Sequence, residues 1–196
     1  MTQIIMIRHG QTDANQQYVI QGQIDNPLNT TGIKQAEQTA VYLKNHGLGF
    51  DLVYASPLNR AILTAQTIIN IINPNLEITT HPGLIERDFG DFDGRKIDGT
   101  YFEMVNNNKI PNMEKNGVLE KRVSDTLKEI AMNNLHKRIL VVTHSHVIKA
   151  LLVKLVNGFQ YSSLLPNCAI NILEYNNDSF RVIQHNLDPL IKNGHS

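Results

Sequence analysis

Residues 138–143 read RILVVT and run directly into HSHVIKALLVKLV at 144–156. A short apolar run rich in β-branched residues is typical of a strand that is buried on both faces. The stretch from Ser145 to Val156 has the length and apolar character of a helix, and Asn157-Gly158 after it is a common helix end. This segment therefore predicts a strand followed at once by a helix, which is the repeating unit of parallel α/β sheets.

The same alternation extends outward along the chain. Further strands are predicted at 3–7, 51–55 and 76–79. Ser56 and Pro57 are expected to be the N-cap and the first residue of the helix that follows the second of these strands. The buried faces of the helices between the strands are expected to consist of Ile33, Ala36, Ala40 and Leu43 before Gly47, then Ala61, Ala65, Ile68, Ile69 and Ile72, then Leu119, Val123, Leu127 and Ile130.

The last part of the chain predicts two more strands. Residues 169–175 and 180–184 are expected to form a hairpin at the sheet edge, with the turn at 176–178. Strands that alternate with helices predict an α/β fold: a three-layer αβα sandwich with a mostly parallel central sheet and helices on both faces. The 196 residues contain no linker or repeat, so residues 1–196 are expected to form a single domain.

Charge balance and cysteine content narrow the range of partners. Eighteen Lys+Arg and eighteen Asp+Glu give a formal net charge of +0, so no overall field gathers nucleic acid or anionic lipid. The single cysteine, Cys168, excludes an internal disulfide and fits a reducing compartment. Because MTQIIMIRHG becomes polar too soon for a signal peptide, we expect a cytoplasmic protein without nucleic-acid or membrane partners, and leave a homodimer open.

Polar side chains follow several of the predicted strands at the point where each strand ends. Arg8 and His9 come directly after the first strand, Arg60 lies about one turn into the helix after the second, Glu86 follows the third, and His144 follows RILVVT. In open parallel sheets, ligands bind outside the carboxyl ends of the strands. We therefore expect these five side chains to converge at one edge of the sheet.

Together these groups suit a phosphate. Two arginines and a helix N-terminus from Ser145 onward form a site for a compact, multiply charged anion. A cation such as Arg60 near a helix N-terminus opposes the macrodipole, at a cost of about 0.3–1 kcal/mol, which also indicates an anion nearby. The cations should lower the pKa of His9 and leave a neutral nucleophile, whereas a bound phosphate should raise the pKa of Glu86 and let it act as an acid.

Ordinary roles and a metal site compete for the same residues. A histidine at a strand end often serves as a hydrogen-bonded surface group, and Glu86 within ERDFGDFD (86–93) could belong to a solvated acidic turn. His144-Ser145-His146 with Glu86 or His9 could ligate a metal, although two arginines would repel a divalent ion. The chain contains no H-E-x-x-H, P-loop or dinucleotide-binding motif. No metal is expected.

The ordered set of residues resembles the histidine phosphatase superfamily, which includes the cofactor-dependent phosphoglycerate mutases. The resemblance runs in the right order from Arg8 to Asn167 and so covers nearly the whole chain. The matching residues are RHGQT (8–12) with Asn15, Gly22 with DNPL (25–28), Gly32 with Gln35 and Ala36, SPL (56–58) with Arg60, Ala61, Thr64 and Ala65, Leu84 with Glu86, Gly90 and Gly94, VTH (142–144), and Asn167.

The resemblance implies a role for each residue of the set. His9 would be phosphorylated by the substrate and the phosphohistidine then hydrolysed, with Glu86 as acid and base. The phosphate would be held by Arg8, Arg60 and His144 as catalytic groups. Substrate contacts would come from Asn15, Gln21, the Gly22 backbone and Ser145. The resemblance implies neither a metal nor an organic cofactor.

Departures from the family pattern bear on which member this chain resembles. Ser145 replaces the usual glycine after the second histidine, which would strain the serine if that position needed a positive φ. His146 follows and could contact substrate, although a structural role is the simpler interpretation. The mutases carry a longer insertion before His144, with paired arginines and a tyrosine where this chain has Phe89. We therefore favour a phosphomonoester hydrolase, with a phosphoglycerate mutase and a non-catalytic phosphate-binding module as alternatives.

Substrate choice is expected to depend on a short cap segment at about 87–117, where the sequence has weak periodicity. Its possible substrate contacts, each of which could equally be a solvated or packed side chain, are Arg87, Arg95, Lys96, Tyr101 and Phe102. No long basic patch suits a polyanion. A small phosphorylated metabolite, such as a sugar phosphate or a phospho-acid, is the expected substrate, with a phosphoprotein left open.

Overall fold

Six strands form one sheet within residues 1–191, the part of the chain that the computed structural model describes. The last five residues of the predicted domain, 192–196, lie outside it. The strand order is β3-β2-β4-β1-β5-β6, and β3, β2, β4 and β1 are parallel, whereas β5 and β6 are added antiparallel to their neighbours. The strands are β1 (Thr2–Arg8), β2 (Leu52–Ala55), β3 (Ile78–Thr80), β4 (Arg138–Thr143), β5 (Ile170–Asn176) and β6 (Ser179–Leu187).

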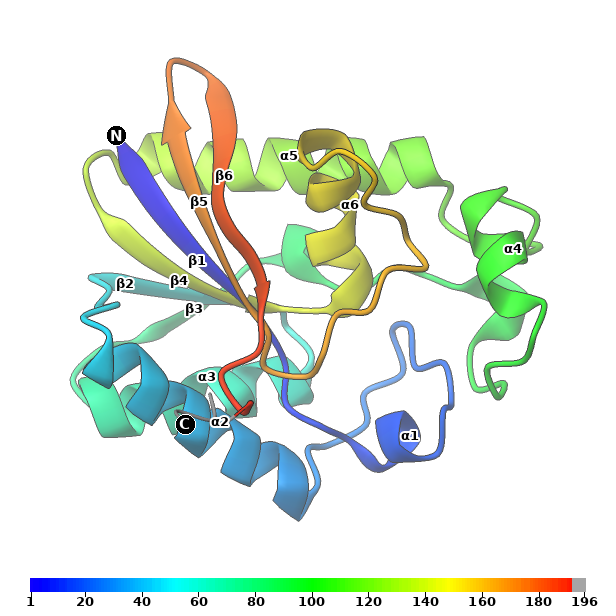
Figure 1. Ribbon diagram of the computed structural model, residues 1–196, viewed down its shortest axis with the longest axis horizontal. Helices are drawn as coiled ribbons and strands as arrows, with labels where there is room; N and C mark the ends of the chain where they lie inside the picture. The colour runs from blue at the N-terminus through cyan, green and yellow to red at the C-terminus, as the bar shows by residue number, and fades with distance from the viewer. Residues whose placement is uncertain (192–196) are drawn as a thin grey trace, which may run out of the picture.

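Helices cover both faces of this sheet, as Figure 1 shows, with α2 and α3 on one face and α5 and α6 on the other. The predicted α/β architecture with a mostly parallel sheet is confirmed. The helices are α1 (Asp13–Gln16), α2 (Thr30–Asn45), α3 (Asn59–Ile72), α4 (Tyr101–Asn106), α5 (Asn116–Asn133) and α6 (Ser145–Leu155), and the single 3₁₀ turns are η1 (Pro82–Leu84) and η2 (Gly90–Phe92). None of the described helices combines the length and the apolarity that a membrane span requires.

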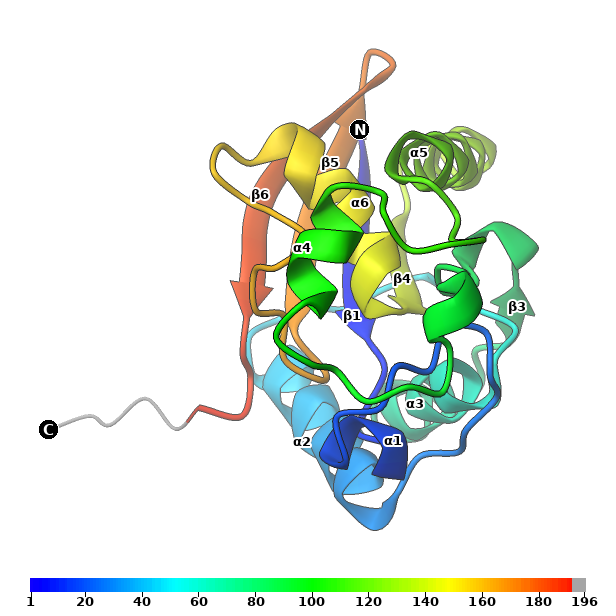
Figure 2. The ribbon, with the colours of Figure 1, turned by 90° about the vertical axis from the view of Figure 1, so that its right-hand side faces the viewer.

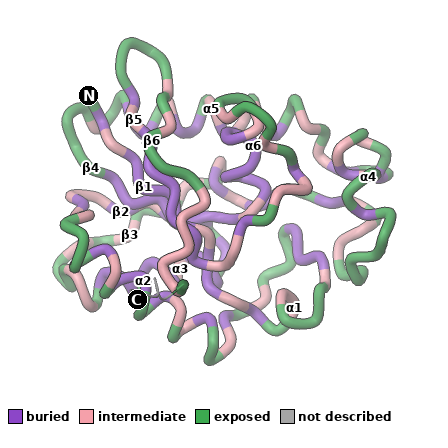
Figure 3. Tube along the Cα trace, in the orientation of Figure 1, coloured by how far each residue is buried: buried purple, intermediate pink, exposed green. Residues whose placement is uncertain are grey.

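The central strands are buried on both sides, as their apolar runs predicted. Ile5 and Ile7 of β1 pack with the α2–α3 side, whereas Ile4 and Met6 pack with the α5–α6 side. Alternate residues of a strand face opposite ways, so one strand contributes to two core layers. Figure 3 shows this burial concentrated along β1 and β4, with α1 and α4 largely at the surface.

The register of the two central strands places the polar residues that follow them side by side. β1 and β4 are parallel, with Arg8 opposite Thr143, and the His9 amide donates to the Thr143 carbonyl oxygen at 2.9 Å. The chain turns away at Gly10, where an added Cβ would lie 2.4 Å from the carbonyl oxygen of Gly32 near the start of α2. Only glycine allows this approach. His9 and His144 therefore leave the sheet at the same edge.

One helix start was predicted wrongly. α3 begins at Asn59 with Leu58 as N-cap and without a side-chain cap from Ser56. Instead the carboxylate of Asp25 accepts from the Asn59 backbone amide at 2.8 Å and from its side chain at 2.6 Å. A carboxylate at this end also complements the helix dipole. Arg60 near this helix start indicated a negative charge nearby. The Asp25 carboxylate supplies part of that charge, from 34 residues earlier in the sequence than Asn59.

Smaller differences concern element ends and the polar segment before α5. β3 starts at Ile78, later than predicted, and β6 extends from Ser179 to Leu187 on both sides of the predicted strand. The predicted hairpin turn is present, and Asn177 and Asp178 both have positive φ. The short helix α4 was not predicted, because its apolar residues form too short a pattern to distinguish it from a loop.

Candidate active site

A cavity of about 620 Å³ opens at the carboxyl ends of β1 and β4. Figure 2 views the molecule from the side on which α1, α4 and α6 lie. We call the charged floor the set of Arg8, His9, Arg60, Glu86 and His144; the first four line the cavity, and His144 lies beside His9 with ring centroids 5.1 Å apart. We call the mouth the four exposed apolar side chains that also line it: Tyr18, Ile97, Phe102 and Leu164. The predicted convergence of five polar residues is thus observed.

The tautomer of His9 follows from its neighbour. Its Nδ1 lies 2.7 Å from the carbonyl oxygen of Gly10, which can only accept, so Nδ1 carries the proton. Nε2 is then the nitrogen with the free lone pair. His9 is 3% exposed, and burial, followed by the charges of Arg60 and Arg8, lowers its pKa well below 6.5. The predicted direction is confirmed, although burial is a larger cause than the cations that the sequence indicated.

Two guanidinium groups are fixed against backbone carbonyl oxygens next to His9. Arg60 donates to Gly22 at 2.7 Å and to Ile24 at 2.6 Å, and Arg8 donates to Leu165. Within residues 1–191, the Nε atoms of both arginines are buried without a hydrogen-bond partner. Because a buried N–H without an acceptor is costly, both arginines are suited to an anion that brings its own oxygen atoms.

His144 is held from behind by Ser56. Its Nε2 lies 2.6 Å from the Ser56 hydroxyl, which also accepts from the Leu58 amide at 3.3 Å. If the hydroxyl donates its proton to Nε2, Nδ1 carries the ring proton. That Nδ1 is buried without a partner among the described residues. Burial, then Arg60, lowers the pKa of His144 well below 6.5, so the ring is a neutral donor.

The carboxyl group of Glu86 lies at the N-terminus of α6, and its two oxygen atoms accept hydrogen bonds from two backbone amides. Its Oε1 accepts from Arg87 at 2.8 Å, and its Oε2 accepts from His146 at 3.4 Å. Burial raises its pKa above 4.5, and the Arg87 amide and Arg60 oppose that rise. The predicted direction is confirmed without any bound phosphate. A buried carboxyl with a raised pKa retains its proton to higher pH, as a general acid must.

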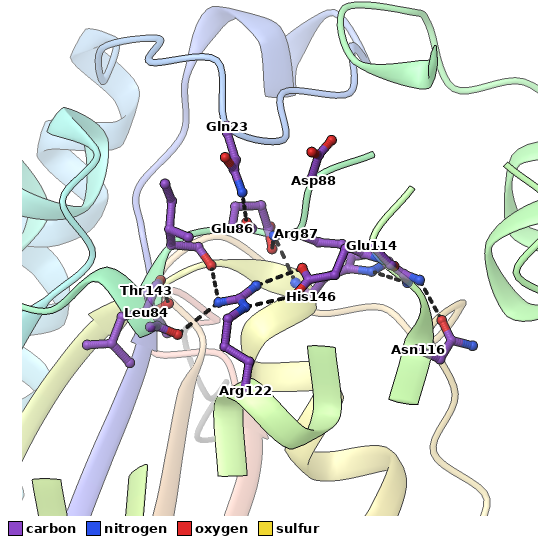
Figure 4. Close-up of polar contacts among 12 residues, drawn as sticks. Gln23, Leu84, Glu86, Arg87, Asp88, Glu114, Asn116, Arg122, Thr143 and His146 are labelled. Carbon is purple, nitrogen blue, oxygen red and sulfur yellow. Dashed lines mark hydrogen bonds and ion pairs between the residues drawn. The ribbon is translucent and has the colours of Figure 1, made fainter. Parts of the chain in front are cut away.

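The segment that carries Glu86 has no regular secondary structure at Glu86 itself, yet it is held firmly. As Figure 4 shows, Arg122 of α5 donates to the carbonyl oxygens of Gly83 and Ile85 at 2.8 and 2.9 Å. The Thr143 hydroxyl donates to that of Leu84 at 2.7 Å, and the Gln23 side chain donates to that of Glu86 at 3.2 Å. Four successive carbonyl oxygens are thus bound by side chains from other parts of the fold. The Glu86 side chain is positioned by these remote donors.

The expected substrate contacts all lie on the cavity wall: Asn15, Gln21, Gly22 and Ser145. Gly22 has φ +43°, a conformation that glycine adopts without strain, and an added Cβ would also displace the Asp93 carboxylate, 2.0 Å away. Ser145 is the first residue of α6, where helical backbone suits any residue at that position. Serine in place of the family's glycine therefore causes no backbone strain at this position.

One residue that the sequence matched to the family, without assigning it to the site, bridges two others. The Asn167 side chain donates to the His9 carbonyl oxygen at 3.0 Å and to Asn15 Oδ1 at 3.2 Å. Asn15 Oδ1 also accepts from the Thr12 amide. With its oxygen engaged, Asn15 is left with its amide N–H groups to offer the cavity. Asn167 could have been predicted as a site residue, because it is the last of the residues that match the family.

The five possible contacts of the 87–117 segment divide into two groups. Tyr101 and Phe102 line the cavity, whereas Arg87, Arg95 and Lys96 do not. Arg87 is buried with its guanidinium donating to the Glu114 carbonyl oxygen at 2.8 Å and to Asn116 Oδ1 at 2.6 Å. Its charge therefore serves the structure of this segment.

Two further residues of α6 line the cavity: His146, for which the sequence left a substrate contact open, and Lys149, which the sequence did not indicate. His146 stacks on Tyr161 with centroids 5.2 Å apart, and its ring nitrogens lie 3.4 Å from Arg87 and from the Tyr101 hydroxyl. These contacts agree with the structural role favoured for it. Lys149 was missed because α6 is buried almost all round, so its polar residue carried no distinct signal.

Among residues 1–191, no three His, Cys, Asp or Glu side chains are grouped as metal ligands. Burial, and after it the positive charges that include Arg60 and Arg8, lower the pKa values of the His9 and His144 imidazoles. Such a field disfavours a divalent cation and favours an anion. The arrangement can therefore bind a phosphate, offer it a neutral imidazole nitrogen, and supply a proton from a carboxyl group.

Comparison with known proteins finds relatives that match almost the whole chain. The sequence profile of the histidine phosphatase superfamily (branch 1) matches residues 4–188. The chain is 33% identical over 190 residues to an uncharacterized phosphatase, PhoE, of Bacillus subtilis (strain 168), covering 96% of each protein. It is 32% identical over 184 residues to a metal-independent phosphoserine phosphatase of Arabidopsis thaliana, covering 88% of this chain and 76% of that protein.

Solved structures agree with the sequence comparison. A mutant phosphoserine phosphatase from Entamoeba histolytica in complex with phosphoserine superposes with a TM-score of 0.81, at 26% identity, over 95% of this chain and 97% of that chain. The same enzyme in complex with 3-phosphoglyceric acid gives a TM-score of 0.80 at 28% identity, with the same coverage.

Proposed function

Because the chain belongs to the histidine phosphatase superfamily, we propose that it hydrolyses small phosphomonoesters through a phosphohistidine formed at His9. The observation that carries this proposal is the pairing of His9 Nδ1 with the Gly10 carbonyl oxygen. It fixes the proton on Nδ1 and leaves Nε2 as an unprotonated nucleophile on the floor of a cavity that also contains Arg8, Arg60 and Glu86.

In the first step, His9 Nε2 attacks phosphorus as the P–O bond to the leaving alcohol breaks. The proton of the Glu86 carboxyl passes to the departing oxygen, so the alcohol leaves neutral. Arg8, Arg60 and the Nδ1–H of His144 donate to the three non-bridging oxygens of the phosphoryl group being transferred, over which negative charge is spread in the transition state. The products of this step are an alcohol, a phosphohistidine and an ionised Glu86.

In the second step, a water molecule attacks phosphorus and the P–N bond breaks. Ionised Glu86 accepts a proton from this water, which returns the carboxyl to its starting form. Inorganic phosphate leaves and His9 Nε2 recovers its lone pair. Every proton in the cycle is carried by Glu86 or water, so the scheme uses the chain's own groups and requires neither metal nor cofactor.

Hydrolysis suits this cavity better than mutase chemistry does. The phosphoglycerate mutases of this superfamily hold the substrate carboxylate with a pair of arginines, in addition to the cations on the phosphate. Among the described residues, the guanidinium groups on the cavity wall are those of Arg8 and Arg60, both on the charged floor. Arg87 is committed to Glu114 and Asn116. The relatives named phosphatases and the small phosphorylated acids bound in similar structures support the same choice.

The test is to trap the phosphoenzyme. Purified protein is mixed with ³²P-labelled phosphomonoester in EDTA, quenched in alkali, and assayed for protein-bound label that is stable to alkali and labile to acid. The wild type should acquire such label, and His9→Ala should not. The matched control is His185→Ala, which removes an exposed histidine of β6. It should label and turn over like the wild type.

Each of the other outcomes identifies an alternative. Phosphate binding without label or turnover would indicate a binding module. Interconversion of phosphoglycerates faster than phosphate release would indicate a mutase. Label in His9→Ala would overturn the assignment of the nucleophile.

A further inference from the structure

A lysine is buried in the wall of the cavity, beyond the charged floor. Lys149 lies in the second turn of α6, is 6% exposed, and lines the same cavity as His9 and Arg8. Lysine is almost never buried to this extent unless its charge is paired. The proposed reaction does not use this residue, so its burial needs another explanation.

The ammonium group has no counter-ion among the described residues. No carboxylate oxygen of residues 1–191 lies within 4.0 Å of Nζ, and its hydrogen bond goes to the carbonyl oxygen of Tyr161 at 2.7 Å. An ammonium carries three N–H donors, so two remain available. Burial lowers the pKa of Lys149 to about 8, which leaves it largely protonated at neutral pH. A buried cation without a direct ion pair favours an anionic ligand.

Lys149 is held in place from the side of Tyr161. The Tyr161 ring stacks on His146 and lies 5.2 Å from the Arg87 guanidinium, and its hydroxyl donates to Glu120 at 3.3 Å. Its carbonyl oxygen is therefore a fixed anchor for the ammonium group. The next two residues, Ser162 and Ser163, line the cavity as well and place hydroxyl groups on the same wall.

The position of Lys149 relative to the charged floor suits one small molecule with two anionic groups. His144 is the N-cap of α6, and Lys149 follows five residues later, about 7.5 Å along the helix axis. Side chains on a helix lean toward its N-terminus, so the lysine leans toward the end at which His144 and Glu86 lie. The two spare N–H donors of the ammonium group match the two oxygen atoms of a carboxylate.

We propose that Lys149 selects the substrate: its ammonium group binds a carboxylate carried by the same small phosphomonoester whose phosphate lies on the charged floor. This inference rests on the proposed phosphatase function and adds the substrate class, a phosphorylated organic acid. Lys149 acts in binding and takes no part in proton transfer.

The experiment compares 3-phosphoglycerate with glycerol 3-phosphate, which share a three-carbon skeleton and differ in a carboxylate against a hydroxymethyl group. Release of inorganic phosphate gives kcat/KM for each ester, and their ratio measures the preference for the carboxylate. The wild type should prefer 3-phosphoglycerate by at least about tenfold, the effect of one charge-assisted contact of about 1.4 kcal/mol. Lys149→Met should reduce this ratio at least tenfold, mainly by raising KM for 3-phosphoglycerate.

Two further variants separate charge from packing. Lys149→Arg retains the cation and should retain most of the preference. Lys154→Met removes an exposed lysine from the same helix and should leave the ratio at its wild-type value. Far-UV circular dichroism and thermal unfolding of each variant confirm that the fold is intact, and hydrolysis of glycerol 3-phosphate by Lys149→Met shows that the charged floor still works.

The outcomes distinguish this inference from the function on which it rests. If the wild type hydrolyses both esters but without preference, or if Lys149→Met slows both equally, the inference is wrong and the phosphatase function stands. If the wild type forms no phosphohistidine and hydrolyses neither ester, both are overturned.

Discussion

The charged floor and the mouth line the same cavity, yet they are built in different ways. The floor residues stand at the ends of β1 and β4, at the start of α3 and in the anchored segment around Glu86, and most are buried. At the mouth, Tyr18 and Leu164 are 71% and 78% exposed and belong to loops. Buried groups with fixed hydrogen bonds act strongly at short range, whereas exposed side chains are solvated and free to move. The floor should therefore determine the rate for every substrate, and the mouth should affect it little.

The largest expected effect in this comparison comes from Glu86→Gln. With glycerol 3-phosphate, kcat should fall by about 10²–10⁴-fold, because the alkoxide cannot leave without a proton. With p-nitrophenyl phosphate the phenolate leaves unaided, so stopped-flow absorbance should show a burst of one equivalent before slow turnover. Glu37→Gln, which changes an exposed glutamate of α2, is the control and should behave as the wild type. Equal losses with both esters and no burst would contradict the acid role.

Arg122→Met tests whether anchoring of the Glu86 segment matters. Arg122 contacts no cavity residue directly but holds the carbonyl oxygens of Gly83 and Ile85. Its loss should lower kcat for glycerol 3-phosphate by roughly tenfold, and by less for p-nitrophenyl phosphate, because a misplaced acid harms the poor leaving group more. Arg181→Met, at an exposed ion pair with Glu174 on the sheet edge, is the matched control. A loss that is the same for both esters would point to general destabilisation.

The pH dependence sharpens the comparison further, since the floor alone contains the groups that titrate in the reaction. Burial lowers the pKa of His9 well below 6.5, so the nucleophile stays neutral and His9 should cause no fall in kcat/KM as pH decreases from 7 toward 6. Burial raises the pKa of Glu86, so its proton persists above pH 4.5 and is lost as pH rises through the raised value. The alkaline fall in kcat/KM for glycerol 3-phosphate should be absent in Glu86→Gln, whose amide does not titrate.

Both enzymes see the same second ionisation of the substrate phosphate, so the difference between their pH profiles isolates Glu86. An acid limb centred at pH 6.5 or above that exceeds the fall caused by the second ionisation of the substrate phosphate would contradict a neutral, buried His9.

The smallest effect is expected at the mouth. Leu164→Ala should change kcat/KM for either three-carbon ester by less than about threefold, because truncating a mostly solvated side chain removes little buried apolar area. Steady-state phosphate release measures it. A change above tenfold would show that the mouth closes on substrate, and the division between floor and mouth would fail.

The sequence predicted the sheet and most of the floor for a physical reason. β1 and β4 are apolar runs buried on both faces, and the polar residues that follow such strands must meet where parallel strands end. Ala36, Ala40 and Leu43 were likewise predicted to be buried and are so. These features follow from the local apolar pattern of each segment. They also follow from the alternation of strands and helices, which predicts a parallel sheet.

The features that escaped prediction depend on contacts between distant parts of the chain. The start of α3 was misplaced because its capping carboxylate comes from Asp25, while the Ser56 hydroxyl is engaged by His144. Lys149 lies on a helix whose surroundings are apolar almost throughout, and its anchor is a backbone carbonyl oxygen, which has no sequence signature. Arg87 looked available for substrate, and only the fold shows where its guanidinium is bound.

The four carbonyl oxygens from Gly83 to Glu86 are each tied to a donor elsewhere in the fold, and none of these donors belongs to the charged floor. Binding of an anion and its chemical conversion therefore depend on different parts of the fold. Replacing Gln23, Arg122 or Thr143 would loosen the segment that positions the Glu86 carboxyl group. The arginines and histidines of the charged floor would still bind phosphate. A variant altered outside the cavity lining could thus bind phosphorylated compounds without converting them.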